Sequence, residues 1–143
     1  MHTTFLRSGA LIAFLAVVLG AFGAHSLKEH VPESAVSIFE TGVRYQFYHA
    51  IALMIAGMLF KEYSNKFIKL AGKLFIVGII LFSGSLYLLT YLKGFNVHGF
   101  DWTGIITPLG GLAFLSGWLC LLRGLSALSL SAHGYDNKKK EES

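Results

Sequence analysis

Several polar and ionisable side chains stand inside segments that are otherwise apolar, and their chemistry needs a reason. Such groups are costly to bury without a partner, so each must meet protein, water or a ligand. They are His25, Glu40, Arg44, Tyr48, His49, Ser83, Tyr87, Thr90 and Thr107. We treat this set as the candidate polar site of the chain.

These residues do not form a catalytic pattern. His25, His49 and His98 are too scattered for the spacing of metal ligands. Glu40 and Asp101 are the only acids near the apolar segments, so neither a Ser-His-Asp set nor paired carboxylates can be assembled. A phosphate-binding glycine loop is also missing from the sequence. The sequence therefore predicts no catalytic residues, no metal and no cofactor, and an enzyme is the least favoured class.

Glu40 and Arg44 are spaced by four residues in the order that favours an ion pair on a helix. They either neutralise each other near lipid headgroups or face a ligand. We expect the planar guanidinium of Arg44 to point into the protein and to contact Glu40 or a neighbouring helix. His49 is either a neutral side chain hydrogen-bonded to a hydroxyl, or a proton relay or ligand contact. For His25, at a helix end, we expect a structural role.

The elements that carry these residues are long apolar runs bounded by charges. Four runs without Asp, Glu, Lys or Arg contain 20, 16, 19 and 21 residues; they are enclosed by Arg7 and Lys28, Arg44 and Lys61, Lys73 and Lys93, and Asp101 and Arg123. A membrane-spanning helix needs roughly 20 mainly apolar residues. The 16-residue run must therefore include polar residues on its N-terminal side. A cleaved signal peptide is the alternative for the first run.

The predicted fold class is an all-α, integral membrane four-helix bundle. We expect helices over about 4–27, 33–60, 69–92 and 103–122, within one membrane domain of residues 1–124. Residues 125–143 are expected to form a hydrophilic cytoplasmic tail, of which the last segment, NKKKEES, should be disordered. Within the first helix, a stripe of small residues should pack closely against another helix: Gly9, Ala13, Ala16, Gly20 and Gly23.

Charge sets the expected orientation and the expected partners. Four spans place both termini on one side, and that side would carry nine of the twelve Lys and Arg residues. Because positive residues favour the cytoplasmic side, we expect both termini in the cytoplasm and the protein in the cell membrane. The basic residues flank apolar runs and form no groove, so membrane lipids are expected partners and nucleic acid is not. A lone Cys120 excludes an internal disulfide and a cysteine metal cluster.

Four blocks of sequence resemble the uncharacterised protein family 0382, also called the domain of unknown function 423 family. They are GAFGAHSLK, FETGVRYQFYHAIAL, FSGSLYLL and ITPLGGLAFLSGWL, in that order, and they cover most of residues 20–119. The resemblance implies a small four-span membrane protein and supplies no active site. Its motif positions fall here on His25, Tyr45, Gln46, His49, Ser83, Ser85, Tyr87, Thr107, Pro108, Gly110 and Gly111.

Two functions remain open at this point. The leading hypothesis is a non-enzymatic membrane protein whose polar cluster serves helix packing or binds a partner, which includes a possible homo-oligomer or another membrane protein. The alternative is a small transporter or channel-like protein with a polar cavity around Arg44 and His49. A water-filled pocket that reaches His49 would favour the second hypothesis.

Overall fold

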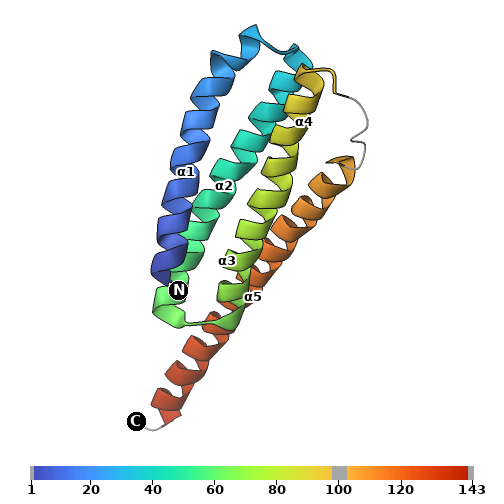
Figure 1. Ribbon diagram of the computed structural model, residues 1–143. Helices are drawn as coiled ribbons and strands as arrows, with labels where there is room; N and C mark the ends of the chain where they lie inside the picture. Colours follow the sequence, from blue (N-terminus) through green and yellow to red (C-terminus); the bar gives the residue numbers. More distant parts are fainter. Residues whose placement is uncertain (1, 98–102, 142–143) are drawn as a thin grey trace.

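The computed structural model describes the backbone of residues 2–97 and 103–141, and the side chains of residues 2–97 and 104–127. Four rods lie side by side (Figure 1): α1 (His2–Ala24), α2 (Glu33–Tyr63), a third rod made of three consecutive helical segments, and α5 (Thr103–Glu141). The described residues contain helices and short connections only. The predicted all-α bundle is confirmed.

Three of the rods are long and apolar enough to cross a membrane: His2–Glu29, Lys66–Gly94 and Gly104–Ala127. The first half of α2 is polar, as its short charge-free run indicates. However, α2 runs between α1 and the third rod along the whole bundle (Figure 1). A helix packed along its length between spanning helices crosses the same layer, so the chain is a multi-pass membrane protein.

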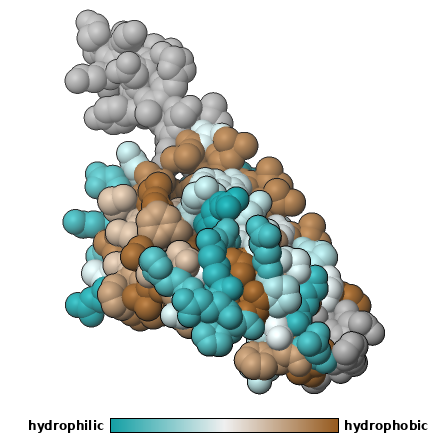
Figure 2. Space-filling view, turned by 90° about the horizontal axis from the view of Figure 1, so that it is seen from above, coloured by the Kyte–Doolittle hydropathy of each residue, from teal (hydrophilic) through white to brown (hydrophobic). Residues whose placement is uncertain are grey.

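The two ends of the bundle differ. We call one the distal end: it holds the α1–α2 connection with the short helix η1 (Leu27–Glu29), and the end of α4. The other, the terminal end, holds the N-terminus and the α2–α3 turn (Figure 1). Seen from the distal end, hydrophilic residues gather beside apolar ones on the surface (Figure 2). Such a polar cap is typical of a bundle end that meets the lipid headgroups.

The small-residue stripe of α1 packs against α2, as predicted. Gly9, Ala16 and Gly23 are buried. A Cβ atom added at Gly9 would lie 2.9 Å from the carbonyl oxygen of Ala50, whereas one added at Gly20 would lie 3.5 Å from Val43. The closest approach of the two backbones is therefore near Gly9, and Gly20 lies where the helices are farther apart. Small residues allow this proximity in lipid, where apolar side chains gain little from association alone.

The third rod contains a π-helical segment that the sequence did not predict. It consists of α3 (Lys66–Gly78), the π-helix η2 (Ile79–Ser83) and α4 (Gly84–Gly94). The backbone of α5 comes closest to it at Gly110, where an added Cβ would meet the backbone of Phe82. Pro108 lies inside α5 two residues earlier and cannot donate a backbone hydrogen bond. A wider π-turn facing a glycine lets the two rods approach.

Two predicted boundaries were wrong. We expected α2 to end near residue 60, but it continues to Tyr63 and stops at Ser64, which has a left-handed backbone (φ 47°). The side chain of Asn65 then accepts a hydrogen bond from the Phe67 amide at 2.8 Å and starts α3. We also expected the last helix to end near residue 122 and the segment NKKKEES to be disordered, whereas α5 continues to Glu141. Extending an existing helix avoids the cost of a new helical nucleus.

The α1–α2 contact leads to a test with two matched glycines. Gly9→Ala should lower the free energy of unfolding by about 1–3 kcal/mol, because its methyl group meets backbone atoms of Ala50 and Met54. Gly20→Ala should be neutral or slightly stabilising, because its methyl group has room and alanine favours helix. Thermal unfolding in mild detergent measures both. Equal effects at the two positions would contradict the packing described here.

Candidate functional site

A chain of hydrogen bonds joins three helices through Gln46. Its Nε2 donates to the carbonyl oxygen of Ile12 on α1 at 3.0 Å, and its Oε1 accepts from the hydroxyl of Tyr87 on α4 at 2.7 Å. Gln46 is 5% exposed. One amide therefore bonds to both neighbours, and a buried network of this kind fixes how the helices are rotated against each other.

His49 lies in a cage of aromatic rings. Its Nδ1 is 2.8 Å from the carbonyl oxygen of Tyr45, and its Nε2 accepts a hydrogen bond from the indole of Trp118 at 3.2 Å. Because a carbonyl only accepts and an indole only donates, Nδ1 carries the proton and Nε2 carries a lone pair. The ring stacks on Phe114, with centroids 3.5 Å apart. Both nitrogens have partners, which describes a neutral histidine that holds α2 to α5.

Hydroxyl groups join the remaining contacts between rods. Ser85 donates to the carbonyl oxygen of Phe82 at 2.9 Å, and its oxygen lies 2.7 Å from the hydroxyl of Thr107 on α5. With its own proton used, Ser85 accepts from Thr107. Thr90 lies 2.8 Å from its own helix at Leu86 O and 3.3 Å from Ala35 O on α2. These groups serve helix packing, which is the role expected of hydroxyls in membrane bundles.

Four residues of the candidate set do not join this interior network. His25, Glu40, Arg44 and Tyr48 are exposed, and within the described part of the chain their side chains make no hydrogen bond or ion pair. Our expectation that Arg44 points into the bundle is therefore wrong. On α2, Arg44 lies about 200° around the axis from Gln46, so a helix that buries Gln46 must expose Arg44.

Arg44 lies well inside the apolar layer. Gly42 packs against Tyr87, which is six residues from Lys93. At 1.5 Å per residue, Arg44 is therefore roughly 12 Å deeper than Lys93. The neighbouring helix α1 gives a similar depth for Arg44. Val43 faces Gly20, and Gly20 lies eight residues before Lys28. A lone charge at the bilayer centre costs about 2.5–3.5 kcal/mol on insertion scales, so this exposure needs an explanation.

Arg44 and His49 do not share a cavity. Arg44 borders a depression of about 320 Å³ between α1 and α2, together with Gly20 and Val43. His49 borders another of about 590 Å³, whose lining includes Phe82, Pro108 and Trp118. The expected polar cavity around both side chains is therefore not formed.

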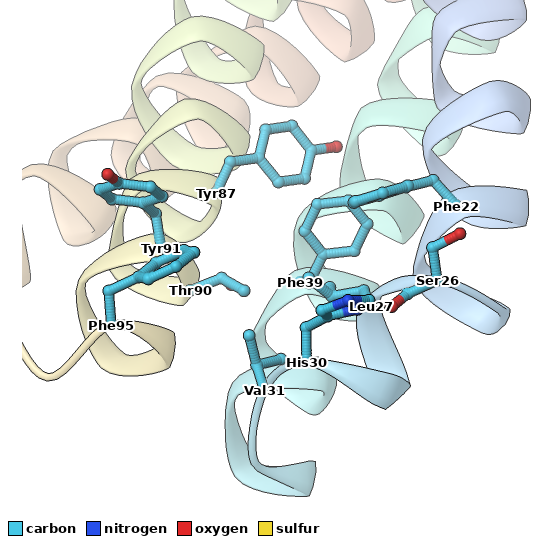
Figure 3. Close-up of a pocket in the computed structure, with 10 residues that line it drawn as sticks. All are labelled: Phe22, Ser26, Leu27, His30, Val31, Phe39, Tyr87, Thr90, Tyr91 and Phe95. Carbon is cyan, nitrogen blue, oxygen red and sulfur yellow. Dashed lines mark hydrogen bonds between the residues drawn. The ribbon is translucent and has the colours of Figure 1, made fainter.

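A separate pocket of about 420 Å³ lies at the distal end, between α1, η1, α2 and α4 (Figure 3). Phe22 and Phe39 face Tyr91 and Phe95 across it, and Tyr87 closes its inner part. Its lining consists of Phe22, Ser26, Leu27, His30, Val31, Phe39, Tyr87, Thr90, Tyr91 and Phe95. It has the size of known small-molecule sites.

The polar atoms in the deep part of this pocket already have hydrogen-bond partners within the protein. The Tyr87 hydroxyl points away from the pocket, to Gln46, and the Thr90 hydroxyl is shared between Leu86 O and Ala35 O. At the rim, His30 Nδ1 lies 2.7 Å from the carbonyl oxygen of Ser26. The carbonyl can only accept, so His30 Nδ1 carries the proton of this hydrogen bond. The pocket is thus apolar inside, with polar groups at its mouth.

The structure divides the nine sequence-predicted residues into two groups. His49, Ser83, Tyr87, Thr90 and Thr107 face the interior or the contacts between rods, and the four exposed residues lie outside. Ser83 is 1% exposed, and its Oγ has no partner among the described residues. The sequence-predicted set omitted Gln46 and Trp118. A glutamine opposite the Glu40–Arg44 face of a spanning helix is the signal that could have identified Gln46.

The fold and the interior network together define a multi-pass membrane protein in which buried polar side chains join the helices. The chain belongs to the family described as protein of unknown function (DUF423), whose sequence profile matches residues 19–111. The predicted membership is confirmed. The matched segment contains all nine candidate residues and the pocket at the distal end.

Relatives in several bacteria cover most of the chain. It is 42% identical to the UPF0382 membrane protein YwdK of Bacillus subtilis over 82% of this chain and 92% of the relative. It is also 42% identical to a UPF0382 membrane protein of Haemophilus influenzae, over 87% of this chain and 94% of the relative. A relative in Staphylococcus aureus is similar to the same degree. No solved structure matches the chain.

The Gln46 network can be tested with two matched tyrosines on α4. Tyr87→Phe removes the donor to Gln46 and should lower the free energy of unfolding by about 1 kcal/mol. Tyr91→Phe removes an exposed hydroxyl that makes no hydrogen bond in the described part of the chain, and should change it little. Unfolding in mixed detergent micelles measures both. A Tyr87→Phe variant as stable as Tyr91→Phe would show that the network is not stabilising.

Proposed function

We propose that this protein is a non-enzymatic membrane protein that binds one chain of a phospholipid in the pocket at the distal end, with both termini in the cytoplasm of the cell. The observation that carries the proposal is the pocket itself: its deep polar groups are paired within the protein, so its interior suits an apolar occupant. An acyl chain there would fill the space with packing contacts and would break no hydrogen bond of the protein.

The mouth of the pocket supports a phospholipid. His30 and Ser26 line the rim, and Lys28 is exposed on the same short connection. Lys28 also lines a small neighbouring depression that shares Val31 with the pocket. A cation at this level is placed to meet a phosphate group, while the chain lies between the aromatic walls. The occupant thus has an anionic head at the distal surface and an apolar tail inside.

The cytoplasmic orientation is supported by charge. The terminal end carries most of the Lys and Arg residues, including Lys61, Lys66, Lys69 and Lys73 around the α2–α3 turn. Positive residues favour the cytoplasmic side. In this orientation the pocket opens toward the outer leaflet.

A transporter is the weaker proposal. It rested on an aqueous cavity lined by both Arg44 and His49, and these side chains border different depressions. Both nitrogens of His49 have partners, so a proton relay there would first have to break the Trp118 or Tyr45 contact. The interior polar groups are better suited to hold helices in place than to line a pathway.

Filling the pocket should displace the lipid. Leu27→Trp places an indole among the aromatic walls and should reduce the retained phospholipid at least fivefold, as measured by native mass spectrometry of protein purified in mild detergent. The matched control is Leu88→Trp, on an exposed face of α4 outside the pocket. Equal lipid retention in both variants, with unchanged helical content, would refute the lipid proposal.

Orientation can be tested with two glutamates at opposite ends. In a Cys120→Ala background, Glu29→Cys at the distal end should react with a membrane-impermeant thiol reagent in intact cells. Glu62→Cys, near the end of α2, should react only after the cells are opened, because it would face the cytoplasm. The reverse pattern would place the termini outside.

A further inference from the structure

The outward face of α2 carries a stripe of polar residues that nothing in the described chain covers. Ser37, Glu40, Arg44 and Tyr48 recur at steps of three and four, so they share one face of the helix. All four are exposed. We propose that this stripe is the interface of a two-fold symmetric dimer, in which Glu40 of each copy pairs with Arg44 of the other.

Pairing within one chain does not remove the need for a partner. Glu40 and Arg44 make no ion pair in the structure. Even a pair along the same helix would leave both groups on the face that meets lipid. The backbone of Arg44 lies roughly 12 Å deeper than that of Lys93, and a similar distance below Lys28. To reach the headgroups at the distal end, its side chain would have to extend along the helix for most of that distance. Another protein surface at the same depth would shield both charges.

A second copy of this chain has the matching charges at the matching depth. Identical membrane proteins insert with the same orientation, so a two-fold axis between them runs along the membrane normal and brings the same face of α2 together. Glu40 and Arg44 differ by one helical turn, roughly 6 Å in height. The flexible arginine side chain spans that height and can bind a carboxylate through two parallel hydrogen bonds. The stripe is therefore complementary to itself.

The surface beside the stripe permits a close approach. A depression of about 320 Å³ runs between α1 and α2, and its lining includes Ala16, Gly20 and Val43. Arg44 and Tyr48 lie along its border. Small residues at a helix surface let another helix come near in lipid, where packing and polar contacts drive association. The dimer contact is thus a polar pair next to an apolar hollow.

The proposal does not depend on the lipid pocket, whose mouth and walls are formed by other residues. It also predicts which positions meet across the axis. With Cys120→Ala as background, Ser37→Cys should form an intermolecular disulfide in native membranes under mild oxidation. Lys93→Cys is the matched control: it is exposed at a similar height on α4 and lies away from the stripe. We expect at least a fivefold higher yield of crosslinked dimer at Ser37.

Charge exchange between two copies then tests the ion pairs. In the Ser37→Cys background, Glu40→Arg alone and Arg44→Glu alone each leave only one sign of charge on the stripe, and each should lower the crosslinking yield at least fivefold. Co-expression of the two variants with different tags should restore crosslinking between the tags. Each chain then supplies the charge that the other lacks, and no pair within a single helix can form.

Loss of the dimer and loss of the ion pairs can each be distinguished from misfolding of the variant. Glu40→Gln and Arg44→Gln serve as milder variants, and membrane insertion and helical content are measured for every variant. Equal crosslinking at Ser37 and Lys93, with inserted and folded protein, would overturn the dimer. Crosslinking that persists in the single charge variants, or is not restored by co-expression, would overturn the ion pairs.

Discussion

The structure depends on one constraint: a polar side chain that enters the hydrocarbon layer must find its partner inside protein. The helix α2 carries two of these side chains, Gln46 and His49, and through them it contacts each of the other rods. Gln46 joins α2 to α1 and α4, while His49 joins it to α5. Because a helix cannot turn one side chain without moving the rest, these two residues fix the rotation of α2 and therefore decide which residues it exposes.

The fold could be predicted from the sequence because its signals are long and additive. Charge-free runs bounded by lysines and arginines gave the rods, and the small-residue stripe of α1 gave the contact with α2. The extension of α5 was missed because its last residues are polar and make a weak periodic signal. The π-helical segment at residues 79–83 was missed because it has no periodic signal of its own, and it lies where Gly110 of α5, distant in the chain, meets Phe82.

The candidate site was only partly predictable. Sequence spacing placed Glu40, Arg44 and Tyr48 on one face of α2, and that grouping is present in the structure. The direction of the face was not in the sequence, since a polar stripe can face a cavity, headgroups or another protein with the same spacing. The decision came from Gln46: its two hydrogen bonds hold the opposite face inside, so Arg44 has to face outward. The apolar residues buried on the same face, such as Phe39 and Leu53, fix the same direction.

This division gives the two faces of α2 different physical roles. On the inner face, Gln46, Tyr87 and Trp118 each donate a hydrogen bond to another helix of the same chain. That face therefore contributes stability and a fixed geometry. On the outer face, the opposite charges of Glu40 and Arg44 are left without a partner in the described chain, and an unpaired Arg44 at its depth in the apolar layer costs free energy. A free monomer in lipid would bear that cost permanently, whereas an assembled one would not. The uncompensated charge therefore favours association, and the rigid inner network keeps both charges on the surface where association can occur.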